Sequence, residues 1–338
     1  MPTTTIRTGV IGYGLSGRIF HAPFLLSNPA FELSVIATGD PDRQREAALT
    51  GAQVVATPAE LLERDLDLVV LASPPHVHVE QALAAFSRGA AVVVDKPFVP
   101  SVSDAKSLIV ASEQAGRPLV VFHNRRWDGD FLTLQGLLPQ LGTVHRFEST
   151  FERWGSAKPG RWQSTLTPAD GAGILFDLGS HLVDQALQLF GPATVEAAEL
   201  VTVRDGASED DAFVSLLHEN GVRSHLTMSR AAGLDGPRFR ALGSEGAYRV
   251  YGLDPQEDQL KNGAAPTDAG FGLADQIGAL SAGSELVEVP SQRGRYADFY
   301  AGVAASILDG APTPVDARDA LEVVRIIERA HEIARATR

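Results

Sequence analysis

The sequence predicts an α/β protein of two domains, the first built on a parallel sheet and the second, an α+β domain, on a large, mainly antiparallel open sheet. From Ile6 to His123, short β-branched runs alternate with helical stretches, the pattern of βαβ units. After Trp127, strand-like runs follow one another without intervening helices. The length of 338 residues also suffices for two domains of ordinary size.

The predicted strands of the first half are nearly continuous apolar runs, as expected where helices cover both faces of a sheet. They are TGVIG (8–12), LSVIAT (33–38), DLVVLAS (67–73), AAVVVD (90–95) and LVVFH (119–123). Thr57 as a cap, Pro58 at the first helical position and Glu60 three residues after the cap predict a helix start. Gly89 and Gly116 predict helix ends.

The second half predicts an antiparallel sheet from FESTFER (147–153), TVEAAELVTV (194–203), 211–230 and 238–252. Asn220-Gly221 predicts a hairpin over 213–230 with a two-residue type I′ turn. Residues 253–294 are rich in Gly, Pro, Ala and Asp, so we expect a long functional or interfacial connection there. We expect a first domain at 1–123, a substrate and oligomerisation domain at 124–315, and a helix at 316–338 that packs back near the first domain.

Composition and charge exclude several classes of protein. A formal net charge of -13 argues against nucleic acid as a partner, because phosphate binding needs clustered Lys and Arg. The absence of cysteine excludes disulfides, thiolate metal sites and cysteine nucleophiles. No apolar run is long enough to span a bilayer and no leader pattern precedes the first strand, so we expect a soluble, cytoplasmic protein without a membrane partner.

A glycine-rich stretch lies between the first strand and the helix that follows it. It reads Gly12, Tyr13, Gly14, Leu15, Ser16 and Gly17, the dinucleotide-binding pattern G-x-G-x-x-G in its expected context. Glycines permit the tight turn and the close approach of a pyrophosphate, and the helix amino terminus supplies free N–H groups. The alternative is three turn glycines in a loop of small residues. We favour a Rossmann dinucleotide-binding domain.

The end of the second strand bears on cofactor choice. If the strand ends at Ala37, the side chain aimed at the ribose is Thr38, which carries no negative charge against a 2′-phosphate and slightly favours NADP(H) over NAD(H). Asp40 would repel that phosphate, although it also suits a helix cap. Arg43 and Arg45 are distant potential phosphate partners.

Two further loops follow parallel strands, at the edge where open α/β sheets bind ligands. The first supplies Ser73, Pro74 and His78, with His78 expected near the nicotinamide ribose. A metal site at His76 and His78 is disfavoured because two prolines precede them and no third ligand is near, and we expect no metal. The second loop supplies Asp95 and Lys96, whose ammonium could transfer a proton or orient a hydroxyl. A solvent-exposed lysine is the alternative.

The stretch GILFDLGSHLVDQ (173–185) carries three ionisable groups in an apolar context. Asp177, His181 and Asp184 are spaced by four and three, so they share one face of a predicted helix. Gly171 and Gly173 beside them suggest a cleft wall that something else approaches closely. His181 would donate or accept the proton while Asp177 fixes its ring. The alternative is a solvated helix face.

Several motifs in order resemble those of the glucose-fructose oxidoreductase and inositol dehydrogenase family. They are VIGYGLSGRIFHAPFL, SPPHVHVEQAL, DKPF, HNRRWDGDF and GAGILFDLGSHLVDQALQLFG, and the resemblance runs from about residue 5 to 330. YGLDPQEDQLKNG (251–263) is similar to the branch containing NADP-dependent scyllo-inositol dehydrogenases. Asp95 stands where the family commonly has Glu, and Gly39 where the NADP branch has a basic residue.

The resemblance implies catalytic roles for Lys96, Asp177 and His181, with Asp184 completing the motif on the substrate side. It also implies that Asn124, Arg125 and Trp127 line the junction of the domains, where they bind a polyol or serve in ordinary packing; Trp162 would reach the nicotinamide or pack. The implied protein is an NAD(P)-dependent oxidoreductase acting on a secondary alcohol of a sugar, sugar derivative or inositol, and a homodimer or homotetramer through the second sheet. A non-catalytic nucleotide or sugar sensor is the second hypothesis.

Overall fold

The computed structural model describes residues 5–155, 165–204 and 206–336, and its contacts divide the chain into two compact units. Unit 1 comprises Met1–Asn124, Gln256–Phe271 and Arg295–Leu321, and unit 2 comprises Arg125–Pro255, Gly272–Gly294 and Glu322–Arg338. Both units are therefore discontinuous, in contrast to the contiguous ranges 1–123, 124–315 and 316–338 expected above. The difference arises because two segments late in the sequence contact the first sheet's unit rather than the second.

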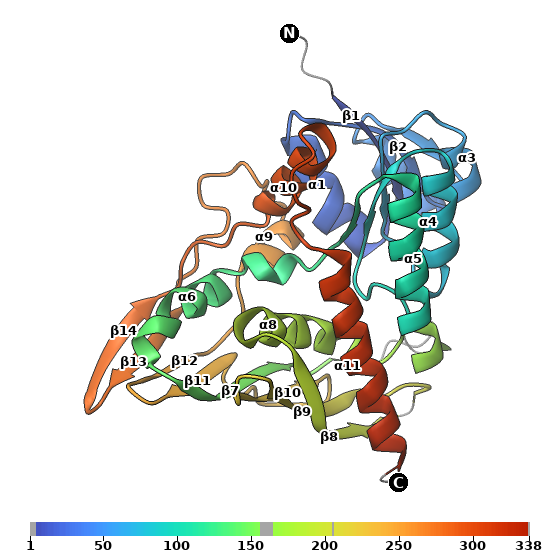
Figure 1. Cartoon of the computed structure of the whole chain (residues 1–338). Helices are drawn as coiled ribbons and strands as arrows, with labels where there is room; N and C mark the ends of the chain where they lie inside the picture. The colour runs from blue at the N-terminus through green and yellow to red at the C-terminus, as the bar shows by residue number, and fades with distance from the viewer. Residues whose placement is uncertain (1–4, 156–164, 205, 337–338) are drawn as a thin grey trace. The chain divides into compact units, whose positions relative to one another are not determined.

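Unit 1 contains a six-stranded parallel sheet in the order β3-β2-β1-β4-β5-β6, with helices beside it (Figure 1). Its strands are β1 (Ile6–Ile11), β2 (Phe31–Ala37), β3 (Gln53–Val55), β4 (Leu68–Leu71), β5 (Ala91–Val94) and β6 (Leu119–Val121). Every residue of β4 and β5 is buried, which explains their unbroken apolar sequence. The strand order reverses between β1 and β4. Sheets of this kind bind ligands outside the carboxyl ends of the strands at that point.

One helix start and two helix ends in unit 1 lie where the sequence indicated them. Its helices are α1 (Ala22–Ser27), α2 (Pro41–Ala48), α3 (Pro58–Leu62), α4 (His78–Ser87), α5 (Val102–Ala115), α9 (Gln256–Lys261) and α10 (Ala297–Leu308). Thr57 accepts a hydrogen bond from the Glu60 N–H at the start of α3. Gly116 caps α5 at φ 61°, and Gly89 follows α4 at φ 78°, so both helix stops are confirmed.

Unit 2 contains an eight-stranded sheet in the order β14-β13-β12-β11-β7-β10-β9-β8. Its strands are β7 (Val144–Glu152), β8 (Ala193–Val201), β9 (Asp211–His218), β10 (Arg223–Ser229), β11 (Phe239–Gly243), β12 (Ala247–Val250), β13 (Ile277–Ala282) and β14 (Glu285–Pro290). The expectation of a mainly antiparallel sheet is confirmed. The sheet is nevertheless mixed, because β7 and β10 run parallel, and the sequence of each strand alone does not reveal its partner's direction.

Two local predictions in the second half of the chain are corrected. The hairpin β9–β10 is present, but Asn220 does not adopt positive φ and Gly221 alone does, at φ 86°. The His218 N–H donates to Val222 O and the Gly221 N–H to His218 O, so the turn is longer than a two-residue type I′ turn. Residues 253–294 contain α9, β13 and β14 rather than one long connection.

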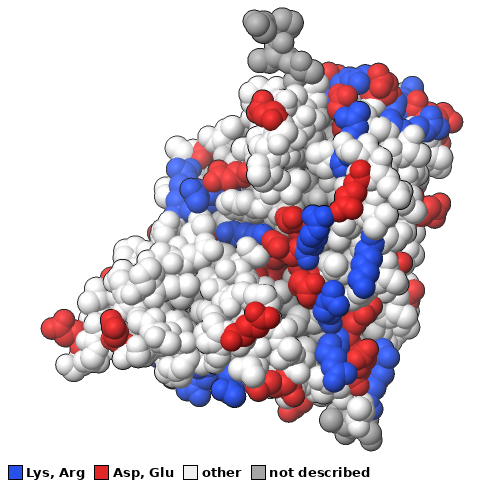
Figure 2. Space-filling model, viewed as in Figure 1, with Lys and Arg blue, Asp and Glu red and all other residues white. Residues whose placement is uncertain are grey.

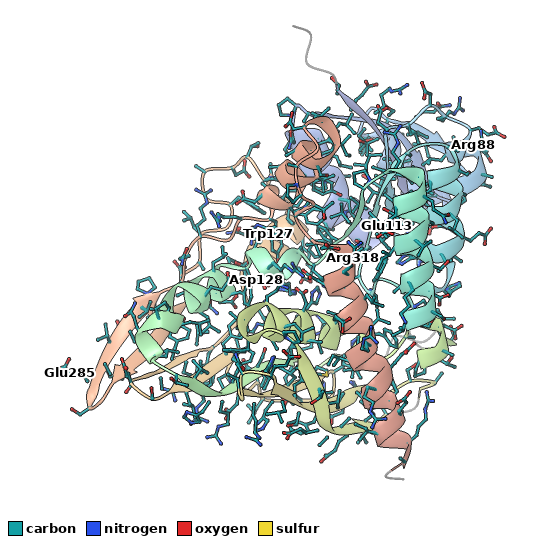
Figure 3. The ribbon with its side chains drawn as sticks, viewed as in Figure 1. Arg88, Glu113, Trp127, Asp128, Glu285 and Arg318 are labelled. Atoms are coloured by element: carbon teal, nitrogen blue, oxygen red, sulfur yellow. The ribbon has the colours of Figure 1, made fainter. Side chains whose placement is uncertain are left out.

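The core of unit 2 lies between the sheet and the helices α6 (Gly129–Leu137), α8 (Ser180–Phe190) and most of α11 (Ala317–Ala336). α11 buries the predicted apolar face, and Val323, Ile327 and Ala330 belong to this core. Its opposite face carries arginines paired with glutamates, and charges of both signs are interspersed on the face shown in Figure 2. In the part of unit 1 that includes the start of α11, Arg318 pairs with Glu113 of α5 (Figure 3). Within the described residues, none of the helices combines the length and apolarity required to cross a membrane.

Candidate active site

The glycine-rich loop of unit 1 connects β1 to a π-helical turn, Ser16–His21, that continues into α1. Gly12 has φ 96°, and a Cβ there would lie 2.5 Å from Ala72 O at the end of β4. A Cβ on Gly17 would lie 2.1 Å from Gly12 O. Both positions therefore exclude side chains for reasons internal to the fold.

Gly14 differs from its two neighbours. A Cβ there would meet only the Arg43 guanidinium, at 3.7 Å, so packing within the chain does not require glycine at this position. Because no side chain blocks it, the Gly14 backbone beside the Arg43 guanidinium leaves room for a pyrophosphate or phosphate. The loop fits a bound dinucleotide, with Tyr13, Leu15 and Ser16 completing it and Leu15 half exposed.

The end of β2 lies where the sequence placed it. β2 ends at Ala37, and the buried Thr38 follows, its carbonyl accepting a hydrogen bond of 2.8 Å from Gln44 Nε2. Asp40 caps α2, accepting from the Asp42 and Arg43 N–H groups. Its other oxygen lies 3.6 Å from Arg43 Nε. The charge of Asp40 is thus offset by the helix start and by Arg43, which reduces its repulsion of a phosphate.

The loop after β4 is held by His78, which is fully buried. Its Nδ1 lies 2.8 Å from Phe98 O and its Nε2 2.8 Å from Ser73 O, so neither nitrogen is left for a ribose or a metal. Burial lowers the pKa of His78 despite these carbonyls. The expectation that His78 contacts the cofactor is corrected: its ring shapes the loop of Ser73 and Pro74, and the Ser73 hydroxyl donates to Gln81 Oε1 at 2.6 Å.

Asp95 and Lys96 follow β5 at the same edge of the sheet. Asp95 is buried, and its Oδ1 accepts a hydrogen bond of 2.7 Å from the Lys96 main-chain N–H. Burial opposes its ionisation, but His21, Lys96 and Ser16 outweigh burial and lower the pKa of Asp95. Lys96 is half-buried, unlike the solvent-exposed lysine considered as the alternative.

In unit 2, the stretch with three ionisable groups forms a π-helical turn, Leu175–Gly179, followed by α8. His181 and Asp184 are 4% and 2% exposed, which excludes the solvated helix face. Arg126 binds Asp184 in a two-pronged ion pair, with Nη2 2.6 Å from Oδ1 and Nε 3.0 Å from Oδ2. Asp184 is therefore held by protein, and the sequence reasoning missed Arg126 although it lies inside HNRRW.

Asp177 lies in the π-helical turn and is about one-third exposed. The guanidinium of Arg230, directly after β10, pairs with its Oδ2. Arg230 was also missed, because 53 residues separate the two partners and no local pattern marks the end of the hairpin. The two carboxylates that flank His181 in the sequence are each matched by an arginine.

The close approach predicted at Gly173 is real, but the approaching group belongs to the chain. Gly173 has φ 109°, and a Cβ there would lie 2.1 Å from Glu209 Oε1. The Glu209 carboxylate accepts from the Leu175 N–H at 3.2 Å and so caps the π-helical turn. This glycine makes room for a structural carboxylate rather than for a ligand.

The segment 124–127 is largely buried. Arg125 donates to Asp128 Oδ2 at 3.2 Å, and its guanidinium lies over the Phe151 ring at 4.8 Å. Its main-chain carbonyl accepts from Gln185 Nε2 of α8 at 2.9 Å.

The other predicted residues of this segment are also shielded from solvent. Trp127 is half-buried and immediately precedes Asp128, the residue before α6 (Figure 3). Asn124 is buried at the end of the first segment of unit 1. Trp162 lies outside the described residues.

A dinucleotide-binding sheet, a lysine at its ligand edge and a second unit with a buried histidine define an NAD(P)-dependent oxidoreductase. The model of the oxidoreductase family with NAD-binding Rossmann fold matches residues 6–123, and the GFO/IDH/MocA C-terminal domain matches residues 139–249. The chain belongs to this GFO/IDH/MocA family. The family and the fold class predicted from the motifs are both confirmed.

Three relatives illustrate the similarity. The oxidoreductase YdgJ of Escherichia coli K12 is 39% identical over 98% of this chain and 96% of its own length. The scyllo-inositol 2-dehydrogenase (NADP(+)) IolW of Bacillus subtilis 168 is 33% identical over 99% of this chain and 95% of its own. The solved structure of the oxidoreductase YvaA from Bacillus subtilis superimposes with a TM-score of 0.93 at 31% identity, covering 100% of this chain and 98% of that one.

Proposed function

We propose that the chain transfers a hydride between NADP(H) and a secondary alcohol carbon of a sugar, sugar derivative or inositol. The observation that carries this proposal is the environment of the three ionisable side chains in unit 2. His181 is buried on α8. Asp177 and Asp184 form ion pairs with Arg230 and Arg126. The names of relatives, among them an NADP-dependent scyllo-inositol 2-dehydrogenase, support the substrate class.

Each catalytic residue has a role set by its chemistry. The bound nicotinamide accepts or supplies the hydride. In the oxidative direction, His181 takes the proton of the hydroxyl, and the Lys96 ammonium stabilises the negative charge that develops on its oxygen. Asp177 pairs with Arg230 and orients the site around His181. Asp184 pairs with Arg126 and is a positioning residue. Asn124, Arg125 and Trp127 remain the proposed polyol contacts.

Arg43 supports the choice of NADP(H). Its Nη1 reaches the free side of Gly14, and Thr38 brings no negative charge to the end of β2. Replacing Arg43 by Gln should weaken NADPH binding at least about tenfold more than NADH binding, since both cofactors carry the pyrophosphate but only NADPH carries the 2′-phosphate. Arg45→Gln is the matched control, because Arg45 lies on the same helix, is exposed and pairs with Asp42. Equal losses for both cofactors would contradict this assignment.

The test of the whole proposal is a cofactor titration followed by turnover assays with myo-inositol, scyllo-inositol, glucose and xylose. His181→Ala and Lys96→Met should each lower kcat by roughly a hundredfold or more while cofactor Kd changes little. The exposed His145→Ala serves as control for loss of a histidine. Tight cofactor binding without turnover of any polyol by the wild type would favour the sensor, and wild-type turnover by the His181 variant would exclude its role in proton transfer.

We further propose a homodimer or homotetramer through the sheet of unit 2. Its helices cover one face, whereas Ile277 of β13 and Leu286 of the edge strand β14, which share a face, are 56% and 72% exposed. Exposed apolar side chains at the edge of a sheet need cover in water. Sedimentation of the wild type and of Ile277→Asp/Leu286→Asp tests this: a monomeric wild type would contradict the assembly.

A further inference from the structure

Three ionisable side chains of unit 1 that are distant in sequence lie close together, and one of them belongs to Asp95, the residue before Lys96. Tyr300 of α10 and His21, at the junction of the π-helical turn and α1, are joined by a 2.7 Å hydrogen bond between the Tyr300 hydroxyl and His21 Nδ1. On the other side of the ring, His21 Nε2 lies 3.9 Å from Asp95 Oδ2. The imidazole therefore stands between a phenol and a carboxylate.

This polar chain is enclosed by aromatic rings. His21 and Tyr300 are 0% and 1% exposed. The Phe122 ring lies 4.4 Å from the His21 ring, and Phe24, Phe31 and Phe299 surround Tyr300. An aliphatic side chain would fill such a place at lower cost, because buried polar groups must find partners. The aromatic setting also excludes water from the hydrogen bond between Tyr300 and His21.

The direction of the hydrogen bond is set by the carboxylate on the far side of the ring, because a protonated phenol can either donate or accept. Burial and the negative charge of Asp95 raise the pKa of Tyr300 well above its ordinary value, so the hydroxyl keeps its proton. When that hydroxyl donates to Nδ1 of a neutral imidazole, the ring proton must reside on Nε2. Nε2–H then faces the Asp95 carboxylate, which is the favourable orientation for a negative charge.

Asp95 connects the imidazole to the main chain of Lys96. One carboxylate oxygen faces His21, and the other accepts from the Lys96 main-chain N–H at 2.7 Å. The Ser16 hydroxyl of the glycine-rich loop also favours the ionised carboxylate. The same carboxylate thereby accepts from the lysine main chain and faces the imidazole nitrogen at 3.9 Å.

We propose that Tyr300 and His21 are positioning residues, a buried relay that orients Asp95 and thereby sets the main chain of Lys96. The structural part stands on unit 1 alone; its effect on catalysis rests on the oxidoreductase function proposed for Lys96. None of the three groups needs to touch the substrate. Neither Tyr300 nor His21 was indicated by the sequence, since 279 residues separate them.

The structural part is tested by NMR of protein labelled with ¹⁵N in its histidine rings. The His21 signals are assigned as those missing from His21→Gln. The wild type at neutral pH should show an unprotonated Nδ1 and a protonated Nε2, and Tyr300→Phe should lose this fixed tautomer. An Nδ1–H tautomer or a persistently charged ring in the wild type would overturn the relay, whether or not any polyol is turned over.

The catalytic part is tested with Tyr300→Phe, which removes one oxygen, and with His21→Gln and His21→Leu. Tyr300→Phe should lower kcat roughly ten- to a hundredfold, the scale for misplacement of a catalytic group, with cofactor Kd little changed. Its acid limb of kcat against pH should move to higher pH, because Asp95 becomes easier to protonate. His21→Gln, which keeps a nitrogen donor, should retain more activity than His21→Leu.

Tyr248→Phe is the matched control, because Tyr248 is equally buried in unit 2 and its hydroxyl has no hydrogen-bond partner among the described residues. Unchanged kcat and an unchanged pH profile in Tyr300→Phe would overturn the positioning role. Absence of wild-type turnover together with the expected tautomer would instead overturn the proposed substrate class and leave the relay intact. Each failure is therefore recognised separately.

Discussion

The buried carboxyl of Asp130 predicts a specific dependence of stability on pH. Asp130 lies on α6 at 0% exposure, where its Oδ1 accepts from the Phe131 N–H at 2.7 Å and Arg238 Nε is 3.8 Å from Oδ2. Burial and the charges of Asp128 and Asp254 outweigh Arg238 and raise the pKa of Asp130 to about 7. The folded protein thus holds a proton that the unfolded chain releases.

The magnitude follows from linkage. The pKa of Asp130 is about 7 in the folded state against an ordinary 3.8, so between these values the folded state binds more protons and stability falls as pH rises. Each pH unit within that window costs about 1.4 kcal/mol, or roughly 4 kcal/mol across the whole of it. Above pH 7 both states are ionised, and this carboxyl adds no further slope.

Asp130→Asn imitates the protonated carboxyl and should remove this slope. Its stability should exceed that of the wild type by roughly 1 to 2 kcal/mol near pH 5 and by roughly 4 kcal/mol at pH 7 to 8. Urea unfolding of both proteins, followed by circular dichroism at half-unit pH steps, measures the difference. Parallel curves from pH 5 to pH 8 would refute the reasoning, since Asp130 would then be ionised in both states or in neither.

Two further predictions concern the cofactor loop. Thr38→Asp should lower the affinity for NADPH relative to NADH by tenfold or more, because it adds a negative charge beside the 2′-phosphate position; an unchanged affinity ratio from fluorescence titration would place that phosphate elsewhere. Gly17→Ala should weaken binding of both cofactors, because its Cβ would lie 2.1 Å from Gly12 O. Gly39→Ala, whose Cβ would meet only Ala56 O at 3.7 Å, should bind them normally; equal losses in the two variants would contradict this reading of the loop.

Much of the fold could be predicted because its signals are local. Continuous apolar runs predict β4 and β5, and the cap at Thr57 predicts α3, since hydrogen bonds and burial within a few residues decide both. The short β3 and the hairpin of β13 and β14 were missed. Three residues of β3 carry too little periodicity, and β13 lies in a stretch whose composition indicates a loop.

The site was predicted in its residue types but not in its partners. Spacing placed Asp177, His181 and Asp184 on one helical stretch, yet it could not foresee that two of them bind arginines. Arg126 reaches Asp184 across 58 residues of sequence. Likewise, a glycine pattern indicates a close approach at Gly173 but not that Glu209 makes it.

The sequence by itself determined the succession of strands and helices, the glycine-rich loop and the family motifs, because each depends on residues close together in the chain. Tertiary structure alone decided the parallel pairing of β7 with β10, the capture of both carboxylates by arginine and the contact of His21 with Tyr300. The physical reason is that partners of a buried polar group are chosen by which distant segments the folded core brings within hydrogen-bond reach. No spacing rule along the chain encodes that distance.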